Sequence, residues 1–321
     1  MILINLILII FFCFLLIKST DVLVQALNSL ARSTRLGKFA ITSFILALAT
    51  SLPELFVGIS AALEKQPNLA LGNVLGSNIS DLSLVIGGAA IVGGSLVVAG
   101  DFLKEEVFYT FLAGALPLLL LIDNQLSRVE GLLLLLIYGV YNYSVLWGKK
   151  KRDISENRSI KKILHRLNQK NNHKQLAWVF LGAALLLFSA DMLVKIATSL
   201  AQQIHMPVLF IGLFIVAIGT SLPELSFEIA AVKKKQVSMA FGDLLGSVVA
   251  NSTLILGITA LIQPIYLEKG LNAYLTATIF FAIIFCFFWI FVKSKKRLER
   301  WEGFVLLFIY IIFIVTEFLK A

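Results

Sequence analysis

The stretch Phe44–Leu55, FILALATSLPEL, returns in the second half of the chain as Phe214–Leu225, FIVAIGTSLPEL, with nine of the twelve positions identical. Both copies lie within apolar runs long enough to cross a bilayer, and each carries one carboxylate, Glu54 or Glu224. A carboxylate at membrane depth is costly and usually marks an ion or substrate pathway. Two matching helices interrupted by proline, one in each half, are typical of the binding site of a transporter built from repeats.

The composition of the 321 residues is that of an integral membrane protein. Hydrophobic residues make up 59% of the chain and charged residues 15%, whereas soluble domains carry about 25% charged residues. The net charge of +9 comes mostly from loops, where basic residues set membrane orientation, so it does not indicate nucleic-acid binding. Cys13 and Cys286 lie far apart in apolar runs; we expect core packing there, with no disulfide and no zinc site.

Ten stretches are long and apolar enough to span the membrane, because a spanning helix needs about 20 residues. They are 2–31, 38–63, 68–97, 104–122, 129–147, 177–202, 207–232, 237–264, 272–292 and 302–319. Spans six to ten repeat spans one to five in a single register, the one that places Phe44 on Phe214 and Gly72–Ser77 on Gly242–Ser247. Since five is odd, the second half must enter the membrane from the opposite side, which predicts two inverted repeats.

Lysine and arginine residues predict the orientation of these spans. The segment 149–174 contains ten of them, and placing it inside leaves twelve in the other inner loops but only four outside. Both termini are therefore expected outside. The predicted protein is an all-α polytopic membrane protein with a first inverted repeat at 1–148, a basic cytoplasmic linker at 149–175 and a second inverted repeat at 176–321.

Each repeat motif, 44–81 or 214–251, gathers oxygen atoms around its glutamate. Pro53 donates no backbone hydrogen bond and frees the carbonyl four residues earlier, and Pro223 does the same in the second half. The positions three and four residues before each glutamate share its helical face and carry hydroxyl groups. These clusters are Thr50, Ser51 and Glu54 in the first half and Thr220, Ser221 and Glu224 in the second.

The next helix of each half adds a polar stripe at intervals of four residues. The two stripes are Asn73, Ser77 and Asp81, and Asp243, Ser247 and Asn251. Three roles are open for Asp243: an ion ligand, a proton site, or a residue that faces water near a helix end. All these ligands are oxygen atoms and no histidine lies near the motifs, so a hard cation such as Ca²⁺ or Na⁺ fits better than zinc or copper.

Charge balance predicts how such a site works. Several carboxylates in one dry site repel one another, and cations or protons must compensate them. If the conformational switch is easy only when charge is balanced, ions must cross alternately, which predicts antiport. A non-transporting sensor or a channel is also open, although a channel explains two symmetric half-sites less well. A membrane-embedded hydrolase with Ser51 or Ser221 as nucleophile would need a base in register and a GxSxG turn, and the sequence has neither.

At these residues the chain resembles the cation/calcium antiporter superfamily, specifically the prokaryotic sodium/calcium exchangers. The marks are TSLPE at Thr50–Glu54 and Thr220–Glu224, followed by G[ND]xxGS at Gly72–Ser77 and Gly242–Ser247. The resemblance covers the whole chain and implies a core of spans two, three, seven and eight, with long spans one and six sliding past it. It implies Ca²⁺/Na⁺ antiport by alternating access, with H⁺/Ca²⁺ or K⁺-dependent Na⁺/Ca²⁺ antiport of the same fold as the alternative.

The resemblance also implies the ion-binding residues. Ca²⁺ is expected between Glu54 and Glu224 with help from the Thr50 and Thr220 carbonyls, and three flanking positions serve Na⁺ or water. The implied metal-binding set is Glu54, Glu224, Thr50, Thr220, Ser51, Ser221, Ser77, Ser247, Asp81, Asn251, Ala47 and Ala217. The close archaeal relatives look to have asparagine at position 81 and aspartate at 251, and here the two are exchanged, so the relatives' Na⁺ and H⁺ assignments do not transfer residue by residue.

The remaining implications concern the surroundings of the protein. The resemblance implies a transporter rather than an enzyme, without catalytic residues or a cofactor. Its partners are the transported Ca²⁺ and Na⁺, with H⁺ or K⁺ under the alternative, and the lipid bilayer, but not nucleic acid. It is expected to be a monomeric multi-pass protein of the cell membrane.

Overall fold

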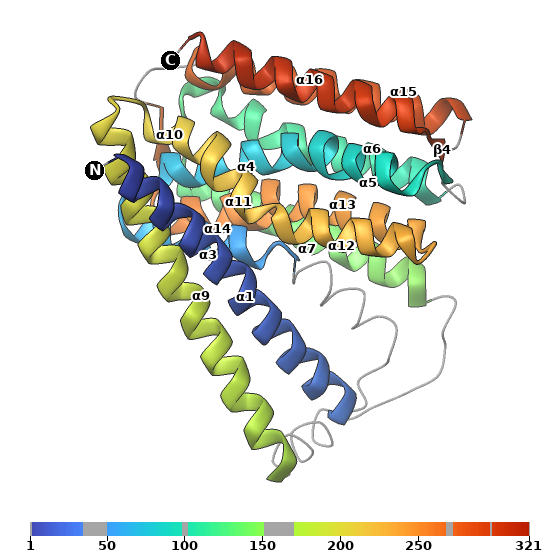
Figure 1. Cartoon of the computed structure of the whole chain (residues 1–321), viewed down its shortest axis with the longest axis horizontal. Coiled ribbons are helices and arrows are strands. Elements are labelled where there is room, and N and C mark those ends of the chain that lie inside the picture. The colour runs from blue at the N-terminus through green and yellow to red at the C-terminus, as the bar shows by residue number, and fades with distance from the viewer. Residues whose placement is uncertain are drawn as a thin grey trace.

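The computed structural model describes residues 2–34, 50–97, 102–150, 170–267, 272–295 and 297–320, which are almost entirely helical (Figure 1). Its helices are α1 (Ile2–Thr34), α3 (Leu52–Leu63), α4 (Pro67–Ser80), η1 (Asp81–Val85), α5 (Ile86–Gly93), α6 (Phe102–Leu120), η2 (Leu121–Asp123), α7 (Arg128–Lys150), α9 (Lys170–Gln203), α10 (Val208–Ile211), η3 (Gly212–Val216), α11 (Ala217–Thr220), α12 (Leu222–Lys233), α13 (Val237–Val249), η4 (Ala250–Ile255), α14 (Leu256–Ile262), α15 (Asn272–Lys295) and α16 (Arg300–Phe318). Its strands are β1 (Leu96–Val97), β2 (Gln125–Leu126), β3 (Ile265–Tyr266) and β4 (Arg297–Leu298).

Eight stretches of the described chain are helical, long and apolar enough to cross a membrane. They are Ile2–Ala26, Pro67–Gly93, Glu106–Asp123, Lys174–Gln203, Val208–Lys233, Val237–Ile262, Tyr274–Ser294 and Arg300–Phe318. Each corresponds to one of the ten predicted spans. Of the other two, 38–63 lies partly outside the described residues and ends in α3, and 129–147 falls within helix α7. The chain is thus a multi-pass membrane protein, while the ten-span inverted arrangement stays a prediction.

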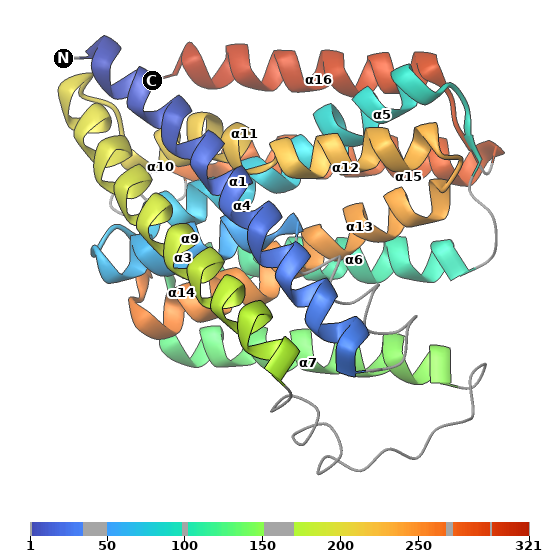
Figure 2. The same ribbon diagram turned by 60° about the horizontal axis from the view of Figure 1, so that its bottom comes forward.

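Helices α1 and α9 form a long antiparallel pair that crosses the other helices at a steep angle (Figures 1 and 2). Gly182 allows them to approach closely, because a Cβ atom there would lie 2.9 Å from the Cβ of Leu23. At the far end of α9, Lys195 contacts Asp191 at 2.9 Å and Glu64, just after α3, at 3.3 Å. The ion pair between Lys195 and Glu64 connects helices α1 and α9 to the end of α3.

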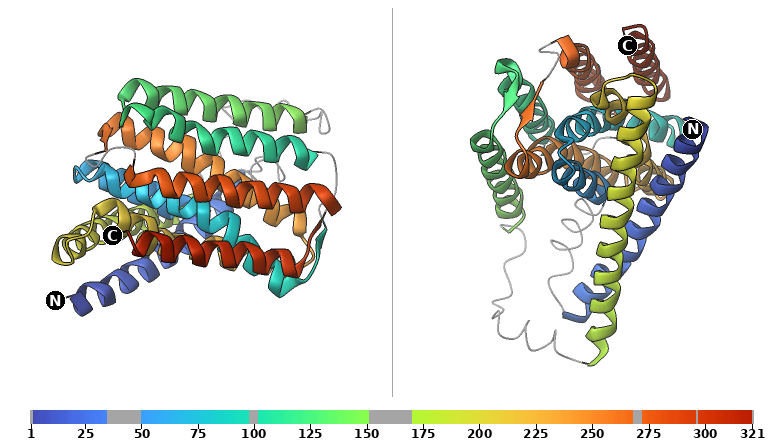
Figure 3. Two further views of the ribbon diagram at one scale, coloured as in Figure 1. Left: turned by 90° about the horizontal axis from the view of Figure 1, so that it is seen from above. Right: turned by 90° about the vertical axis from the view of Figure 1, so that its left-hand side faces the viewer.

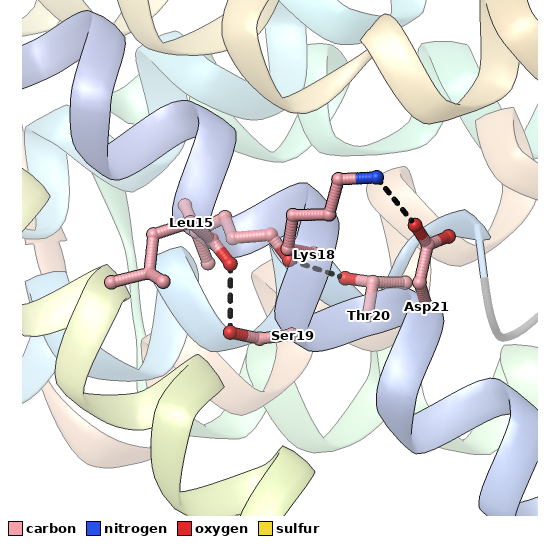
Figure 4. Close-up of polar contacts among 6 residues, drawn as sticks. Leu15, Lys18, Ser19, Thr20 and Asp21 are labelled. Atoms are coloured by element: carbon pink, nitrogen blue, oxygen red, sulfur yellow. Dashed lines mark hydrogen bonds and ion pairs between the residues drawn. The ribbon is translucent and has the colours of Figure 1, made fainter.

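Polar side chains inside α1 form hydrogen bonds within their own helix (Figure 4). The hydroxyl of Ser19 donates to the carbonyl of Leu15 at 2.7 Å, and Thr20 donates to Leu16 at 2.9 Å. Such bonds satisfy a hydroxyl group at membrane depth without a neighbouring helix. Cys13, on the same helix, is buried as expected, but Cys286 is exposed, so the prediction of core packing is wrong for Cys286.

The other long helices form a bundle in which each half packs against the other (Figure 3). In one crossing, a Cβ atom on Gly87 of α5 would lie 2.9 Å from the carbonyl oxygen of Gly303 in α16. In the other, a Cβ atom on Gly257 of α14 would lie 2.9 Å from the carbonyl oxygen of Gly131 in α7. Gly87 and Gly257 are counterparts in the register of the repeat, so each half uses the same position for a close contact with the other.

Two short strand pairs also join the halves. β1 pairs with β4 and β2 pairs with β3, both antiparallel and two residues long. The sequence analysis predicted no strands, because two residues are too few to show an alternating pattern. Each pair connects a loop of the first half to a loop of the second.

Candidate functional site

Both TSLPE segments adopt the same local conformation. The helix is interrupted at Ser51, with φ −84° and ψ 8°, and at Ser221, with φ −82° and ψ 1°. A new helix, α3 or α12, begins at the next residue with Pro53 or Pro223 in its first turn. Proline is well tolerated there because that backbone position has no hydrogen-bond acceptor within the helix. The prolines therefore produce the interruption that the sequence predicts.

The two glutamates lie in the first turns of these new helices, where the helix dipole favours negative charge. Glu54 is 1% exposed and Glu224 is 2% exposed. The two carboxylates are close enough to interact electrostatically. The Oε2 atom of each has no hydrogen-bond partner in the described part of the chain. Two buried acids from opposite halves are thus brought together, each with an oxygen atom available to a cation.

The threonine of each motif donates a hydrogen bond across to the other half. Thr50 Oγ1 donates to Asp243 Oδ1 at 3.0 Å, and Thr220 Oγ1 donates to Asn73 Oδ1 at 3.1 Å. The two hydrogen bonds are counterparts in the register of the repeat. Asp243 is 4% exposed in the middle of α13, so the role of a residue facing water near a helix end is wrong for it. Its second oxygen, Oδ2, has no partner among the residues described.

The serines do not follow this symmetry. Ser51 Oγ donates to Ser247 Oγ at 3.1 Å, which links the two halves. Ser77, the counterpart of Ser247, instead donates to Glu54 Oε1 at 3.5 Å within its own half. Ser221 Oγ is buried and lacks a hydrogen-bond partner in the described chain. The Ser77 hydroxyl therefore contacts the carboxylate of its own half, whereas the Ser221 hydroxyl lies beside the Asp81 carboxylate of the other half.

Asp81 and Asn251 lie in wide helical turns that both halves share. η1 begins at Asp81, and η4 begins at the residue before Asn251; both elements are π-helices. Such turns displace the side chains from the regular helical register and occur frequently at functional sites. Both residues are 1% exposed, and the Oδ1 atom of each has no described partner. Asp81 interacts electrostatically with Glu54, so it belongs to the same cluster.

Glycines place α4 directly against the interrupted helix of the other half. A Cβ atom on Gly72 would lie 2.1 Å from the carbonyl oxygen of Leu209, and one on Gly76 would lie 2.0 Å from that of Leu213. No side chain larger than glycine fits between these backbones. The close approach carries Asn73 to α11, where it accepts the hydrogen bond of Thr220.

Eleven of the twelve predicted site residues are described, and Ala47 lies outside the described residues. Ala217 is fully buried, and its carbonyl oxygen accepts a hydrogen bond from Thr220 at 3.3 Å. The sequence analysis missed Glu228, which is 0% exposed and lies one turn after Glu224. The available signal was its spacing of four positions from Glu224 within an apolar helix.

The oxygen atoms left without a partner define what this cluster can bind. Among the described members of the predicted site and Asp243 they are Glu54 Oε2, Asp81 Oδ1, Ser221 Oγ, Glu224 Oε2, Asp243 Oδ2 and Asn251 Oδ1. Carboxylate, hydroxyl and amide oxygens are ligands that hard cations prefer. Within the described chain, no three histidine, cysteine or acidic side chains are grouped closely enough to hold one metal ion together.

Comparison with known proteins adds independent findings. The family model described as sodium/calcium exchanger protein matches residues 4–147 and 174–319. The putative antiporter CaxA of Alkalimonas amylolytica is 33% identical over 302 residues, which cover 92% of this chain and 93% of that protein. The sodium/calcium exchanger MaX1 of Methanosarcina acetivorans is 26% identical, with 94% and 95% covered. A solved structure of the sodium-calcium exchanger NCX_Mj, soaked with Na⁺ and Sr²⁺, is similar with a TM-score of 0.65 at 25% identity, covering 98% of this chain and 99% of that one.

Proposed function

This chain belongs to the sodium/calcium exchanger protein family, and from this premise we propose that it exchanges Ca²⁺ for Na⁺ across the membrane. The family membership makes it a cation/calcium antiporter rather than an enzyme. The choice of Na⁺ as the counter-ion, and alternating access as the mechanism, are our proposals. The observation that supports them best is the pair of buried glutamates that opposite halves of the chain bring together.

In the proposed site, Ca²⁺ lies between Glu54 and Glu224. Each glutamate offers a buried oxygen atom without a partner in the described chain, and the interrupted helices supply nearby backbone carbonyl groups. Na⁺ ions take the flanking positions when Ca²⁺ leaves. The residues proposed to line these positions are Thr50, Thr220, Ser51, Ser221, Ser77, Ser247, Asp81, Asn251, Ala47 and Ala217.

Charge balance couples the two ions. Two ionised glutamates with no cation between them are strongly disfavoured in a dry site, so the empty site resists closure. One Ca²⁺ or several Na⁺ ions restore neutrality and allow the switch. The antiparallel pair α1 and α9, which crosses the bundle at a steep angle, is the element that slides during the switch (Figure 1).

Additional buried acids favour a second candidate function. Asp81 and Asp243 interact electrostatically with each other and with Glu224. Carboxylates beyond the central pair can take K⁺ or H⁺ along with or instead of Na⁺. K⁺-dependent Na⁺/Ca²⁺ exchange and H⁺/Ca²⁺ exchange are therefore the alternatives.

We propose that the protein is a monomer in the cell membrane. Its proposed arrangement has ten spans in two inverted repeats, with both termini outside. The strand pairs support this orientation. β1 lies at the predicted inner end of span 68–97 and β4 in a loop predicted inside, whereas β2 and β3 belong to loops predicted outside. Each pair thus joins segments that the basic residues assign to one side of the membrane.

Uptake of ⁴⁵Ca²⁺ into proteoliposomes tests the proposal directly. Gradients of Na⁺, K⁺ and pH are imposed one at a time. We expect the outward Na⁺ gradient to drive uptake at fixed pH. Uptake driven by the pH gradient alone would instead support H⁺/Ca²⁺ exchange. Calcium that leaves loaded vesicles at full rate with no counter-cation outside would refute antiport.

A further inference from the structure

Glu228 is a third buried glutamate that the proposed mechanism does not use. It lies one turn after Glu224 on the same face of α12. Its side chain is 0% exposed, and neither of its carboxylate oxygens has a hydrogen-bond partner among the described residues. No described lysine, arginine or histidine forms an ion pair with it. When ionised, a buried carboxylate of this kind needs a cation that compensates its charge.

The neighbours of Glu228 are acids rather than bases. Helix α12 packs against α13, which carries Asp243, and against η1 and α5, where η1 carries Asp81. Both aspartates interact electrostatically with Glu228. Asp243 Oδ2 and Asp81 Oδ1 are buried and also lack a described partner. Glu228 thus lies among acidic side chains, and no described basic side chain forms an ion pair with it.

This feature belongs to the second half alone. The counterpart of Glu228 in the register of the repeat is Gly58. A Cβ atom on Gly58 would lie 2.8 Å from Ile255 Cγ2 and 3.1 Å from Thr259 Oγ1. The first half therefore has no space for an equivalent carboxylate. Each half otherwise contributes one glutamate and one aspartate to the cluster, so Glu228 gives the second half one additional buried acid.

We propose that Glu228 and Asp243 form an additional subsite for one alkali-metal cation. The described acids do not gather in threes around one point, and Ca²⁺ takes six to eight oxygen ligands that are rich in carboxylates. A monovalent cation matches one or two carboxylates better. The inference rests on the proposed exchange function and adds to it a cation position in the second half.

The subsite lies between Glu224 and the end of α12 at Lys233, which the basic residues place inside. A cation there neutralises Glu228 without occupying the position between Glu54 and Glu224. It therefore changes the number of alkali cations bound by the protein, while Ca²⁺ keeps its own ligands.

Equilibrium binding to the purified full-length chain tests the subsite. ²²Na⁺ and ⁸⁶Rb⁺, the latter in place of K⁺, are measured without Ca²⁺ in the unaltered protein and in Glu228→Gln. We expect the variant to bind one alkali cation fewer per chain, and the isotope whose binding falls identifies the ion. The matched control is Glu317→Gln, the same change at a buried carboxylate near Lys320 and Thr276, away from the cluster. The control should bind as many cations as the unaltered protein.

A second measurement needs no variant. Anomalous scattering from Rb⁺ or Tl⁺ in crystals of the unaltered protein should give a peak at the Glu228 carboxylate. Equal cation binding in Glu228→Gln and the unaltered protein, or no peak at Glu228 when the ion saturates the central site, would overturn the subsite. A failure of the proposed exchange function can be distinguished from a failure of the subsite. In that case the unaltered protein would show no Ca²⁺ exchange in any gradient.

Discussion

At the residue scale, the site combines close repetition of hydroxyl contacts with unequal placement of charge. Thr50 and Thr220 make equivalent hydrogen bonds across the halves. The acids outside the glutamate pair do not repeat: Asp81 has an asparagine as its counterpart, and Glu228 has a glycine. In the proposed alternating access the inverted halves exchange roles, so unequal charge would give the two faces of the site different affinities for cations.

Neutralising either central glutamate should abolish calcium exchange. In Glu54→Gln or Glu224→Gln the shape is kept, but one charge of the pair proposed to hold Ca²⁺ is lost. Loss of one buried charge partner costs about 2 kcal/mol or more, so calcium affinity should fall by at least about 30-fold. ⁴⁵Ca²⁺ flux in proteoliposomes checks this, with thermal unfolding as the control for folding. Near-normal exchange in either variant would contradict the site.

Moving one charge across the pseudo-twofold axis tests the exchanged pair. Asp81→Asn should weaken cation binding by about tenfold, because a carboxylate that acts on Glu54 is removed. The double variant Asp81→Asn with Asn251→Asp restores the total charge on the opposite side. We expect recovery of most of the affinity but a changed ratio of inward to outward exchange rates, measured with vesicles loaded on either side. A double variant no better than Asp81→Asn would show that charge total does not govern binding.

At the scale of elements, close backbone contacts and wide helical turns position the site. Helix α4 lies against α10 and η3 through Gly72 and Gly76. The equivalent π-helical turns at η1 and η4 then displace the side chains that follow. The proposed ligands are thus held by rigid helices, whereas a loop would let them relax away from an ion.

Alanine at Gly76 should force α4 away from η3. The added methyl group would lie 2.0 Å from a carbonyl oxygen of Leu213, and overpacking of this kind costs about 1–3 kcal/mol of unfolding free energy. Exchange should fall as well, since Ser77 and Asn73 move with the helix. Gly139→Ala on α7 is the matched control, because no described atom lies within 4 Å of its added Cβ. Thermal unfolding in detergent and ⁴⁵Ca²⁺ flux measure both effects; equal behaviour of the two variants would refute the contact.

At the scale of the whole molecule, reciprocal contacts hold the two halves together. Each half packs a glycine of its third span against the last long helix of the other, and each strand pair crosses between halves. The two chain ends lie at the same end of the molecule, near α10 (Figure 2). This arrangement agrees with termini on one side of the membrane, as an even number of spans requires.

Cysteine labelling on intact cells tests the orientation. In a variant whose two native cysteines are replaced, Lys320→Cys should react with a membrane-impermeant maleimide from outside, because the C-terminus is predicted there. Lys234→Cys, in the loop after α12, should react only after the membrane is permeabilised. The opposite pattern of labelling would show that the protein has the reverse orientation. Labelling of both sites in intact cells would contradict the odd number of spans predicted between them.

Much of this protein could be predicted from the sequence because the relevant signals are local. Long apolar runs identify a membrane protein, since the bilayer sets their length. The repeated TSLPE segments indicate the broken helices, because proline acts on its own helix. Glu54 and Glu224 stand out, since any acid in an apolar run does.

Only the tertiary structure decided which of these groups meet. The contact of Thr50 with Asp243 joins residues 193 positions apart, and the burial of Glu228 without a described partner depends on the helices that pack around it. The wide turns at η1 and η4 and the two-residue strands leave no periodic mark in the sequence. Sequence spacing specifies which residues share one face of a helix, but not which face of a neighbouring helix they contact. That contact depends on how closely the two backbones approach, and here the glycines of α4 determine the approach.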